Sequence, residues 1–205
     1  IPIDDLIPGG THPARVKLLK EELIAFQTGM VSLRSKMKTS KAEPCIESGS
    51  WHKDFLSMFP YELTTAQSRV EKEINKDLIK SEPMMRLVQG DVGSGKTAVA
   101  VLAATKALDS NFQAAFMAPT TLLAQQHFEN IKKFFPNHID KIELLTSGLT
   151  KSVRKKILEK VKSGKIKFIV GTHAIFQADV EYCNLALAII DEQHRFGVNQ
   201  RLALI

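Results

Sequence analysis

Residues 90–97, Gly-Asp-Val-Gly-Ser-Gly-Lys-Thr, constrain the fold of this chain more than any other stretch. They match the phosphate-binding loop pattern G-x-x-x-x-G-K-[ST] at every fixed position. Residues 86–89 before the loop are typical of a short buried strand, and residues 98–104 after it are typical of a buried helix. In this context of strand, glycine loop and helix, backbone N–H groups surround an anion at a helix N-terminus.

The loop also carries side chains that suit a nucleotide and its metal ion. Lys96 can reach the β- and γ-phosphates, and the Thr97 hydroxyl can ligate Mg²⁺. The alternative is a glycine-rich turn with a surface lysine. We therefore predict ATP and Mg²⁺ as cofactors, with these loop residues binding ATP: Gly90, Asp91, Val92, Gly93, Ser94, Gly95, Lys96 and Thr97.

A second segment delivers two carboxylates. Residues 187–190 are apolar and predict a buried strand, and Asp191 and Glu192 follow at its carboxyl end. Asp191 is predicted to hold Mg²⁺, and Glu192 is predicted to polarise the attacking water as a general base. Taken alone, the pair could also be an acidic transition from strand to loop. With Lys96, these two residues form the predicted catalytic set.

From residue 55 onward, strands alternate with helices, which predicts an α/β fold: a parallel sheet covered by helices on both faces. Strands are expected at about 86–90, 113–118, 141–146, 167–172 and 185–191. Helices are expected at about 64–80, 96–109, 120–135 and 150–163. Ligands of such sheets bind at the carboxyl ends of the strands.

The N-terminal region differs in pattern. Apolar residues recur at helical spacing over about 14–38, whereas residues 39–54 are polar and aperiodic, as in a linker. We therefore expect a helical connector over 1–56 and the α/β domain over 57–205, incomplete at its C-terminus. Both ends read as though the chain were a fragment of a longer protein.

Composition narrows the function classes. The chain is 44% hydrophobic and 24% charged, as expected of a globular domain. Its two cysteines form no C-x-x-C pair, which argues against zinc or redox chemistry and fits the cytoplasm. No apolar run approaches the roughly 18 residues of a membrane helix. The net charge of +6 permits a nucleic-acid partner without establishing one.

Three weaker signals have two interpretations each. Gln67, preceded by Tyr61, suits an adenine edge, but Thr64-x-x-Gln67 is also a capping box. The loops at 118–121 and 171–173 suit nucleic-acid phosphates, but their threonines are also ordinary helix caps. A basic stretch is either a solvated helix face or a phosphate-contacting surface. It comprises Lys151, Arg154, Lys155, Lys156, Lys160, Lys162, Lys165 and Lys167.

These motifs, in this order, resemble the first motor domain of superfamily 2 helicases. Three stretches, 86–97, 171–177 and 191–201, closely resemble the RecG family of bacterial branched-DNA helicases. The resemblance covers about 57–205, and the helix that begins near 12–15 is similar to that family's connector. Ser94 and Gln193 distinguish the chain from the related transcription-repair coupling translocases, which stay an alternative.

The resemblance implies a RecA-like ATP-binding domain that couples ATP hydrolysis to remodelling of stalled forks and Holliday junctions. It implies that Tyr61 and Gln67 contact adenine. It implies DNA contacts through phosphates at Pro119, Thr120, Thr121, Thr172 and His173.

A second RecA-like domain and a wedge domain are missing, so this stretch alone is expected to be nearly inactive. The other alternative is a nucleotide-dependent binding module without turnover. A P-loop kinase or transport ATPase fits less well, since Gln193 and His194 follow the acidic pair.

Overall fold

The computed structural model describes part of the chain, namely Lys17, Lys20, Glu21, Ile24 and residues 41–46, 48–91 and 93–192. The chain divides into two compact units, residues 1–41 and 42–205. In the first unit, Lys17, Lys20, Glu21 and Ile24 are helical, and Lys17 lies 4.0 Å from Glu21 in an i,i+4 ion pair. The rest of the helix expected over 14–38 lies outside the described residues.

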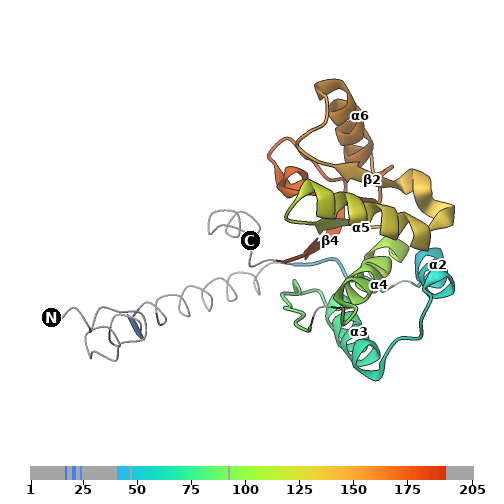
Figure 1. Ribbon diagram of the computed structural model, residues 1–205, viewed down its shortest axis with the longest axis vertical. Helices are drawn as coiled ribbons and strands as arrows, with labels where there is room; N and C mark the ends of the chain where they lie inside the picture. The colour runs from blue at the N-terminus through green and yellow to red at the C-terminus, as the bar shows by residue number, and fades with distance from the viewer. Residues whose placement is uncertain are drawn as a thin grey trace. The chain divides into compact units, whose positions relative to one another are not determined.

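The second unit is built on a parallel sheet (Figure 1). Its strands are β1 (Gln113–Met117), β2 (Ile142–Leu145), β3 (Phe168–Gly171) and β4 (Leu185–Ile190). They lie in the order β2-β3-β1-β4, and every neighbouring pair is parallel. At the centre, Phe116 of β1 lies opposite Val170 of β3 and Ile189 of β4. The predicted parallel α/β architecture is confirmed.

Helices cover both faces of this sheet, because alternate side chains of a strand point to opposite faces. Ala114 and Phe116 pack into a core with helices α4 (Lys96–Asp109) and α5 (Thr121–Phe134). Ala115 and Met117 pack into a second core with helix α6 (Lys151–Lys162). The remaining helices are α2 (Ser50–Met58), α3 (Thr65–Leu78) and the short 3₁₀ helices η2 (Pro136–Lys141) and η3 (His173–Phe176). The described helices include none long and apolar enough to cross a bilayer.

One expected strand is not formed. Residues 86–90 are extended but pair with no strand, and the Leu87 side chain is 76% exposed. A strand needs a neighbour to bond its N–H and C=O groups, and apolar residues alone do not supply one. In the described part of the chain, β4 is the edge of the sheet, and no strand pairs with its outer side.

The linker expected over 39–54 ends in a packed helix, although its described residues before that helix, 41–46, 48 and 49, lie in no helix or strand. Helix α2 begins at Ser50, and its Trp51 and Phe55, one turn apart, are buried in the core. Asp109 of α4 accepts hydrogen bonds from the backbone N–H of Trp51 (3.0 Å) and of His52 (3.1 Å), thereby capping α2 from another helix. The compact unit therefore begins at Ala42, upstream of the boundary expected at residue 57.

Candidate functional site

The glycines of the 90–97 loop adopt the conformation that the motif requires. Gly93 has φ +81° and Gly95 has φ +80°, both in the left-handed region that favours glycine. A Cβ atom at Gly95 would also collide with the side-chain amide of Gln67. The loop then passes directly into α4, whose first residue is Lys96. Val92 lies outside the described residues.

The loop folds around the Lys96 ammonium group. Lys96 Nζ donates to the carbonyl oxygens of Gly90 (2.7 Å) and Asp91 (2.6 Å). The N–H of Ser94 donates to the Asp91 carbonyl (3.2 Å), which closes the turn. These contacts hold Lys96 against the loop at the N-terminus of α4, a position at which an anion is stabilised.

The side-chain amide of Gln67 makes two contacts: one caps helix α3, and the other reaches the phosphate-binding loop. Its Oε1 accepts from the backbone N–H of Thr64 (2.9 Å), and the Thr64 hydroxyl accepts from the N–H of Gln67 (3.2 Å), so the capping box is formed. Its Nε2 donates to the carbonyl of Ser94 in the loop (2.9 Å). Tyr61 lies nearby in the sequence with 76% of the residue exposed. Its aromatic ring is therefore available to a planar ligand.

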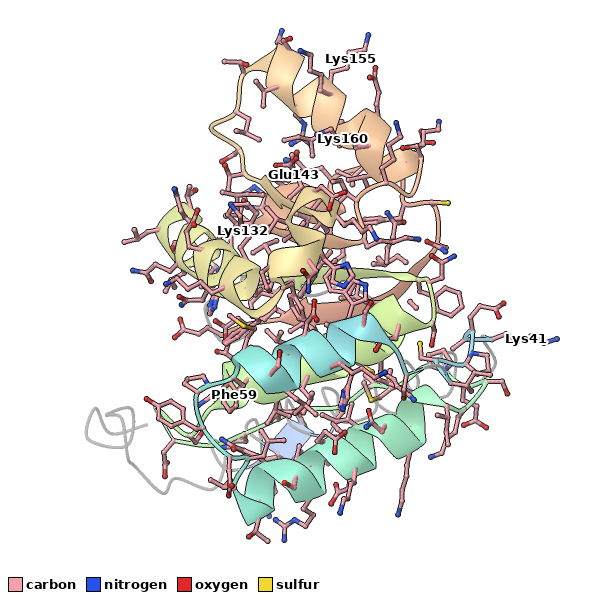
Figure 2. All side chains as sticks on the ribbon, turned by 90° about the vertical axis from the view of Figure 1, so that its right-hand side faces the viewer. Lys41, Phe59, Lys132, Glu143, Lys155 and Lys160 are labelled. Carbon is pink, nitrogen blue, oxygen red and sulfur yellow. The ribbon has the colours of Figure 1, made fainter. Side chains whose placement is uncertain are left out.

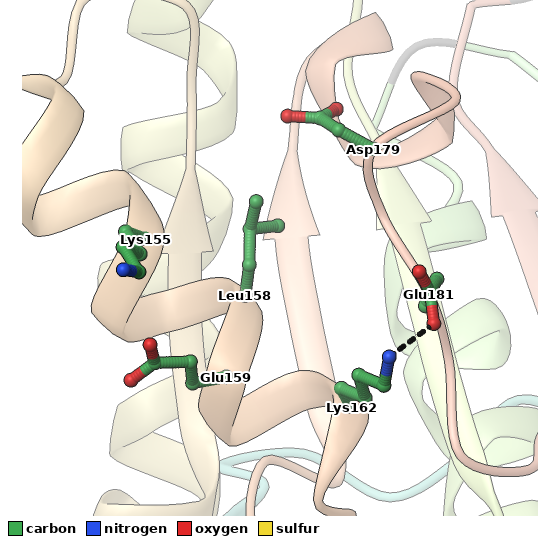
Figure 3. A pocket seen from close by; sticks show the side chains of 6 residues that line it. All are labelled: Lys155, Leu158, Glu159, Lys162, Asp179 and Glu181. Atoms are coloured by element: carbon green, nitrogen blue, oxygen red, sulfur yellow. Dashed lines mark ion pairs between the residues drawn. The ribbon is translucent and has the colours of Figure 1, made fainter.

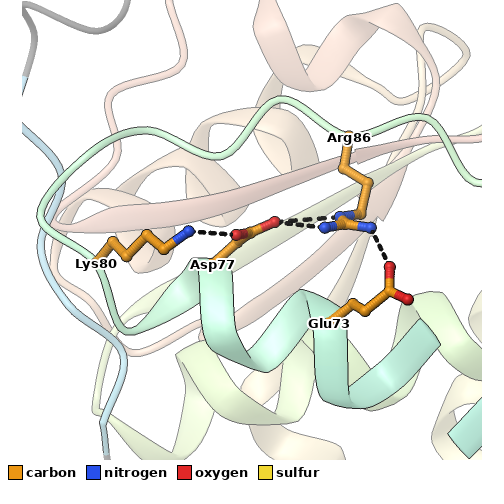
Figure 4. A network of polar contacts seen from close by, with 4 residues as sticks. All are labelled: Glu73, Asp77, Lys80 and Arg86. Carbon is orange, nitrogen blue, oxygen red and sulfur yellow. Dashed lines mark hydrogen bonds and ion pairs between the residues drawn. The ribbon is translucent and has the colours of Figure 1, made fainter. Parts of the chain in front are cut away.

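An ion-pair network fixes the segment that enters the loop (Figure 4). Arg86 bonds Glu73 (2.8 Å) and Asp77 (2.7 Å) of α3, and Lys80 also bonds Asp77 (2.8 Å). The hydrogen bonds from Lys80 and Arg86 lower the pKa of Asp77, and Asp77 raises the pKa of Arg86. Because these side chains are partly exposed, each pair contributes about 1 kcal/mol or less. The network therefore orients the segment more than it stabilises the fold.

The acidic pair lies at the carboxyl end of β4, as predicted. The backbone N–H of Asp191 donates to the carbonyl of Met117 (2.8 Å), which continues the pairing between β1 and β4. The Asp191 Oδ2 atom lies 2.9 Å from Nε2 of His127 on α5. This hydrogen bond lowers the pKa of Asp191 most, the backbone of Glu192 and the Lys96 ammonium lower it further, and burial opposes them. The positive charge of Lys96 therefore contributes to the electrostatic environment of the Asp191 carboxylate.

The backbone of Glu192 adopts a conformation that is unusual for a residue other than glycine. Its φ of +49° lies in the left-handed region, which costs a non-glycine residue on the order of 1 kcal/mol. This conformation turns the chain after the strand. Such backbone strain is common at functional sites. Gln193 and His194, which complete the motif, lie outside the described residues.

The two threonine loops lie at the same edge of the sheet but differ in exposure. Thr120 is exposed and caps α5, its hydroxyl accepting from the N–H of Leu123 (3.2 Å). Pro119 is half-buried, whereas Thr121 and His173 are exposed. Thr172 is 4% exposed and its hydroxyl makes no capping bond. The capping interpretation thus holds for Thr120 and not for Thr172.

Half of the basic stretch is paired within the protein. Arg154 bonds Asp179 (2.7 Å), Lys160 lies 3.6 Å from Glu143, and Lys162 bonds Glu181 (2.6 Å). Lys167 Nζ donates to a backbone carbonyl, that of Asn111 (2.8 Å). Figure 2 shows Lys160 beside Glu143 and Lys155 projecting from α6. The open pocket beside α6 contains acids as well as lysines: Lys155, Leu158, Glu159, Lys162, Asp179 and Glu181 (Figure 3). This mixed charge favours the solvated-face interpretation there.

Sequence reasoning missed His127. It lies in the helix after the Thr120 loop, and nothing in its spacing marks it as a partner of Asp191, 64 positions later. The signal that could have found it is indirect. Helix α5 begins at the carboxyl end of β1, and Asp191 follows the carboxyl end of the neighbouring strand β4, so a polar residue in the first turns of α5 can reach that carboxylate.

Comparisons with known proteins agree with this site. Residues 64–205 match the family model described as DEAD/DEAH box helicase. Curated relatives are named ATP-dependent DNA helicase RecG. The Haemophilus influenzae protein is 46% identical over 98% of this chain, and the Escherichia coli K12 protein is 47% identical over 95%. The Thermotoga maritima protein is 43% identical over 94%. The chain spans 29%, 28% and 25% of these relatives, respectively.

Solved structures agree on the fold. The structure of RecG bound to a three-way DNA junction matches with a TM-score of 0.77 and 41% identity, over 90% of this chain and 25% of that one. A hypothetical ATP-dependent RNA helicase from Sulfolobus tokodaii matches with a TM-score of 0.52 and 19% identity, over 70% of this chain and 41% of that one. The second likeness concerns the fold alone. The resemblance to RecG is confirmed, and this chain belongs to the DEAD/DEAH box helicase family.

Proposed function

We propose that this chain is the ATP-binding motor domain of a DNA helicase that couples ATP hydrolysis to remodelling of branched DNA. The observation that carries the proposal is the phosphate-binding loop, with Gly93 and Gly95 in the left-handed conformation and Lys96 at the start of α4, in a chain whose β4 strand ends in the Asp191-Glu192 pair. The similarity to a RecG that was solved on a three-way DNA junction supports the choice of substrate.

The residues proposed to bind and hydrolyse the nucleotide have roles that their chemistry supports. Backbone N–H groups of 90–97 bind the phosphates, and Lys96 exchanges its two carbonyl partners for phosphate oxygens. Gln67 and the exposed Tyr61 ring hold adenine. Glu192 accepts a proton from the attacking water as general base.

The donor set fits a magnesium ion. Mg²⁺ prefers hard oxygen ligands and takes few of them from the protein. Thr97 offers a hydroxyl at the first turn of α4, and Asp191 offers a carboxylate that its lowered pKa keeps ionised. These two residues would hold the ion. When bound, the ion neutralises the charge on the phosphates as the reaction proceeds.

The proposed DNA contacts lie at the carboxyl edge of the sheet. Thr120, Thr121 and His173 are exposed there and Pro119 is half-buried, whereas Thr172 is buried. They offer phosphate contacts and no element that reads bases. We infer a connector before the motor domain, and a second RecA-like domain and a wedge domain elsewhere in the full-length protein, which acts in the bacterial cytoplasm.

Strand displacement from a synthetic three-way junction tests this proposal. The full-length protein should separate the junction strands with ATP and Mg²⁺, and neither with ADP nor in the Lys96→Ala variant. ATP binding without strand displacement or DNA-dependent turnover would favour the nucleotide-dependent binding module. Movement along duplex DNA without strand separation would favour a translocase of the transcription-repair coupling type.

A further inference from the structure

His127 places a ring nitrogen on the carboxylate that is proposed to hold Mg²⁺. Its Nε2 lies 2.9 Å from Asp191 Oδ2, and both side chains are largely shielded, with 14% and 27% of their surfaces exposed. A neutral imidazole can donate from Nε2 at this distance. The hydrogen bond engages Oδ2 and restrains rotation of the group. A carboxylate has about four lone-pair sites, so the bonds from His127 and from the Glu192 backbone leave room for a ligand.

The imidazole is itself held in place. Its ring lies 4.8 Å from the ring of Phe116, which is 1% exposed at the centre of the sheet. Helix α5 carries the histidine and begins at the Thr120 cap, so the ring is anchored through the backbone as well. Asp191 is fixed at its backbone by the Met117 carbonyl. Main chain and side chain of the carboxylate are therefore restrained by different elements.

We propose that His127 is a positioning residue that orients the Asp191 carboxylate for Mg²⁺ and thereby sets the Mg²⁺ requirement of nucleotide binding. The inference rests on the proposed function. Hydrogen bonds from outside the metal's own ligands fix ligand orientation, and their loss typically lowers metal affinity about 10- to 100-fold. If His127 only stabilised the fold, its substitution would weaken nucleotide binding by the same factor in the presence and in the absence of Mg²⁺.

The test is binding of a fluorescent ATP analogue to the full-length protein, titrated with Mg²⁺ and repeated in excess chelator. In His127→Ala, we expect the Mg²⁺ concentration for half-maximal binding to rise about 10-fold. His127→Gln, whose Nε2 can donate from a similar position, should recover most of the loss. Affinity in chelator should stay the same in all variants, and Gln125→Ala, an exposed neighbour on α5, should match the wild type throughout.

A double-mutant cycle separates positioning from packing. If His127 acts through Asp191, His127→Ala should change the Mg²⁺ requirement no further in an Asp191→Asn background. An unchanged Mg²⁺ requirement in His127→Ala overturns the inference and leaves the proposed function standing. Absence of Mg²⁺-dependent binding in the wild type overturns both. If His127→Ala does not fold, the comparison is made between His127→Gln and the shorter His127→Asn, and equal Mg²⁺ requirements overturn it.

Discussion

Gln67 joins helix α3 to the phosphate-binding loop through a single amide. Its Oε1 completes the cap at Thr64, while its Nε2 donates to the Ser94 carbonyl 2.9 Å away. A carboxylate in its place can still accept from Thr64, as capping boxes with glutamate do, but it cannot donate to Ser94.

Gln67→Glu should therefore separate the cap from the contacts that need an amide. We expect its free energy of unfolding to stay within about 0.5 kcal/mol of the wild type. Its affinity for ATP should fall about 5-fold, the value of one lost hydrogen bond of about 1 kcal/mol. Denaturant titration and fluorescent-nucleotide binding measure the two quantities. Unchanged affinity would show that neither the bond to the loop nor an amide contact with adenine is needed for binding.

Lys96→Ala should weaken nucleotide binding by on the order of 2 kcal/mol, because a charge-assisted bond to phosphate is lost. The measurement is a binding isotherm with Mg²⁺ present. Lys72→Ala, an exposed lysine on α3, is the matched control and should bind as the wild type does. Equal affinity in the two variants would contradict the assignment of the loop.

Glu192→Gln should keep nucleotide binding and lose turnover, since glutamine cannot take a proton from water. We expect the turnover rate to fall about 100- to 10,000-fold. Single-turnover hydrolysis in the full-length protein separates this from binding. A loss of binding with normal turnover per bound ATP would mean that the roles of Asp191 and Glu192 are assigned wrongly.

His138 makes the docking of α2 sensitive to acid. Its ring stacks on Trp51, with centroids 4.0 Å apart, and burial lowers its pKa, helped by Lys141 and opposed by nearby carboxylates including Asp54. Because the folded state then prefers the neutral ring, the unfolded chain binds the proton more readily. The free energy of unfolding should fall as the pH drops below about 6.5, until the folded-state pKa is passed.

Denaturant titrations between about pH 7.5 and 5 measure this slope. His138→Phe keeps an aromatic ring against Trp51 and removes the proton, so its slope should be shallower over the same range. Equal slopes in the two proteins would assign the acid sensitivity to other groups.

The sequence predicted those parts of the fold that local pattern determines. The loop and α4 were predictable because the glycines, Lys96 and the apolar run specify strand, turn and helix within one short segment. The strand at 86–90 was wrong, because pairing depends on a neighbour and not on the segment itself. Helix α2 was missed because residues 50–54 contain a single apolar residue, Trp51, whose burial depends on distant elements such as α4 and His138 of η2.

The site was predictable to the same extent. Asp191 follows β4 at the carboxyl end of a parallel strand, as the pattern predicts, whereas the loop at 90–97 follows a segment that forms no strand. The use of Gln67 for both a cap and a loop contact needed three dimensions, because Ser94 is 27 positions away. Likewise, the burial of Thr172 comes from packing and not from its motif.

The most direct test of the account is steady-state ATP hydrolysis by the full-length protein with and without branched DNA. The account predicts that a three-way junction stimulates turnover into the usual enzyme range of about 1 s⁻¹ or more. Lys96→Ala and Glu192→Gln should both abolish that stimulation, while only Glu192→Gln keeps the affinity of the wild type for the nucleotide. Turnover that is indifferent to DNA, or stimulation that survives both substitutions, would contradict the claim that this domain drives a DNA motor.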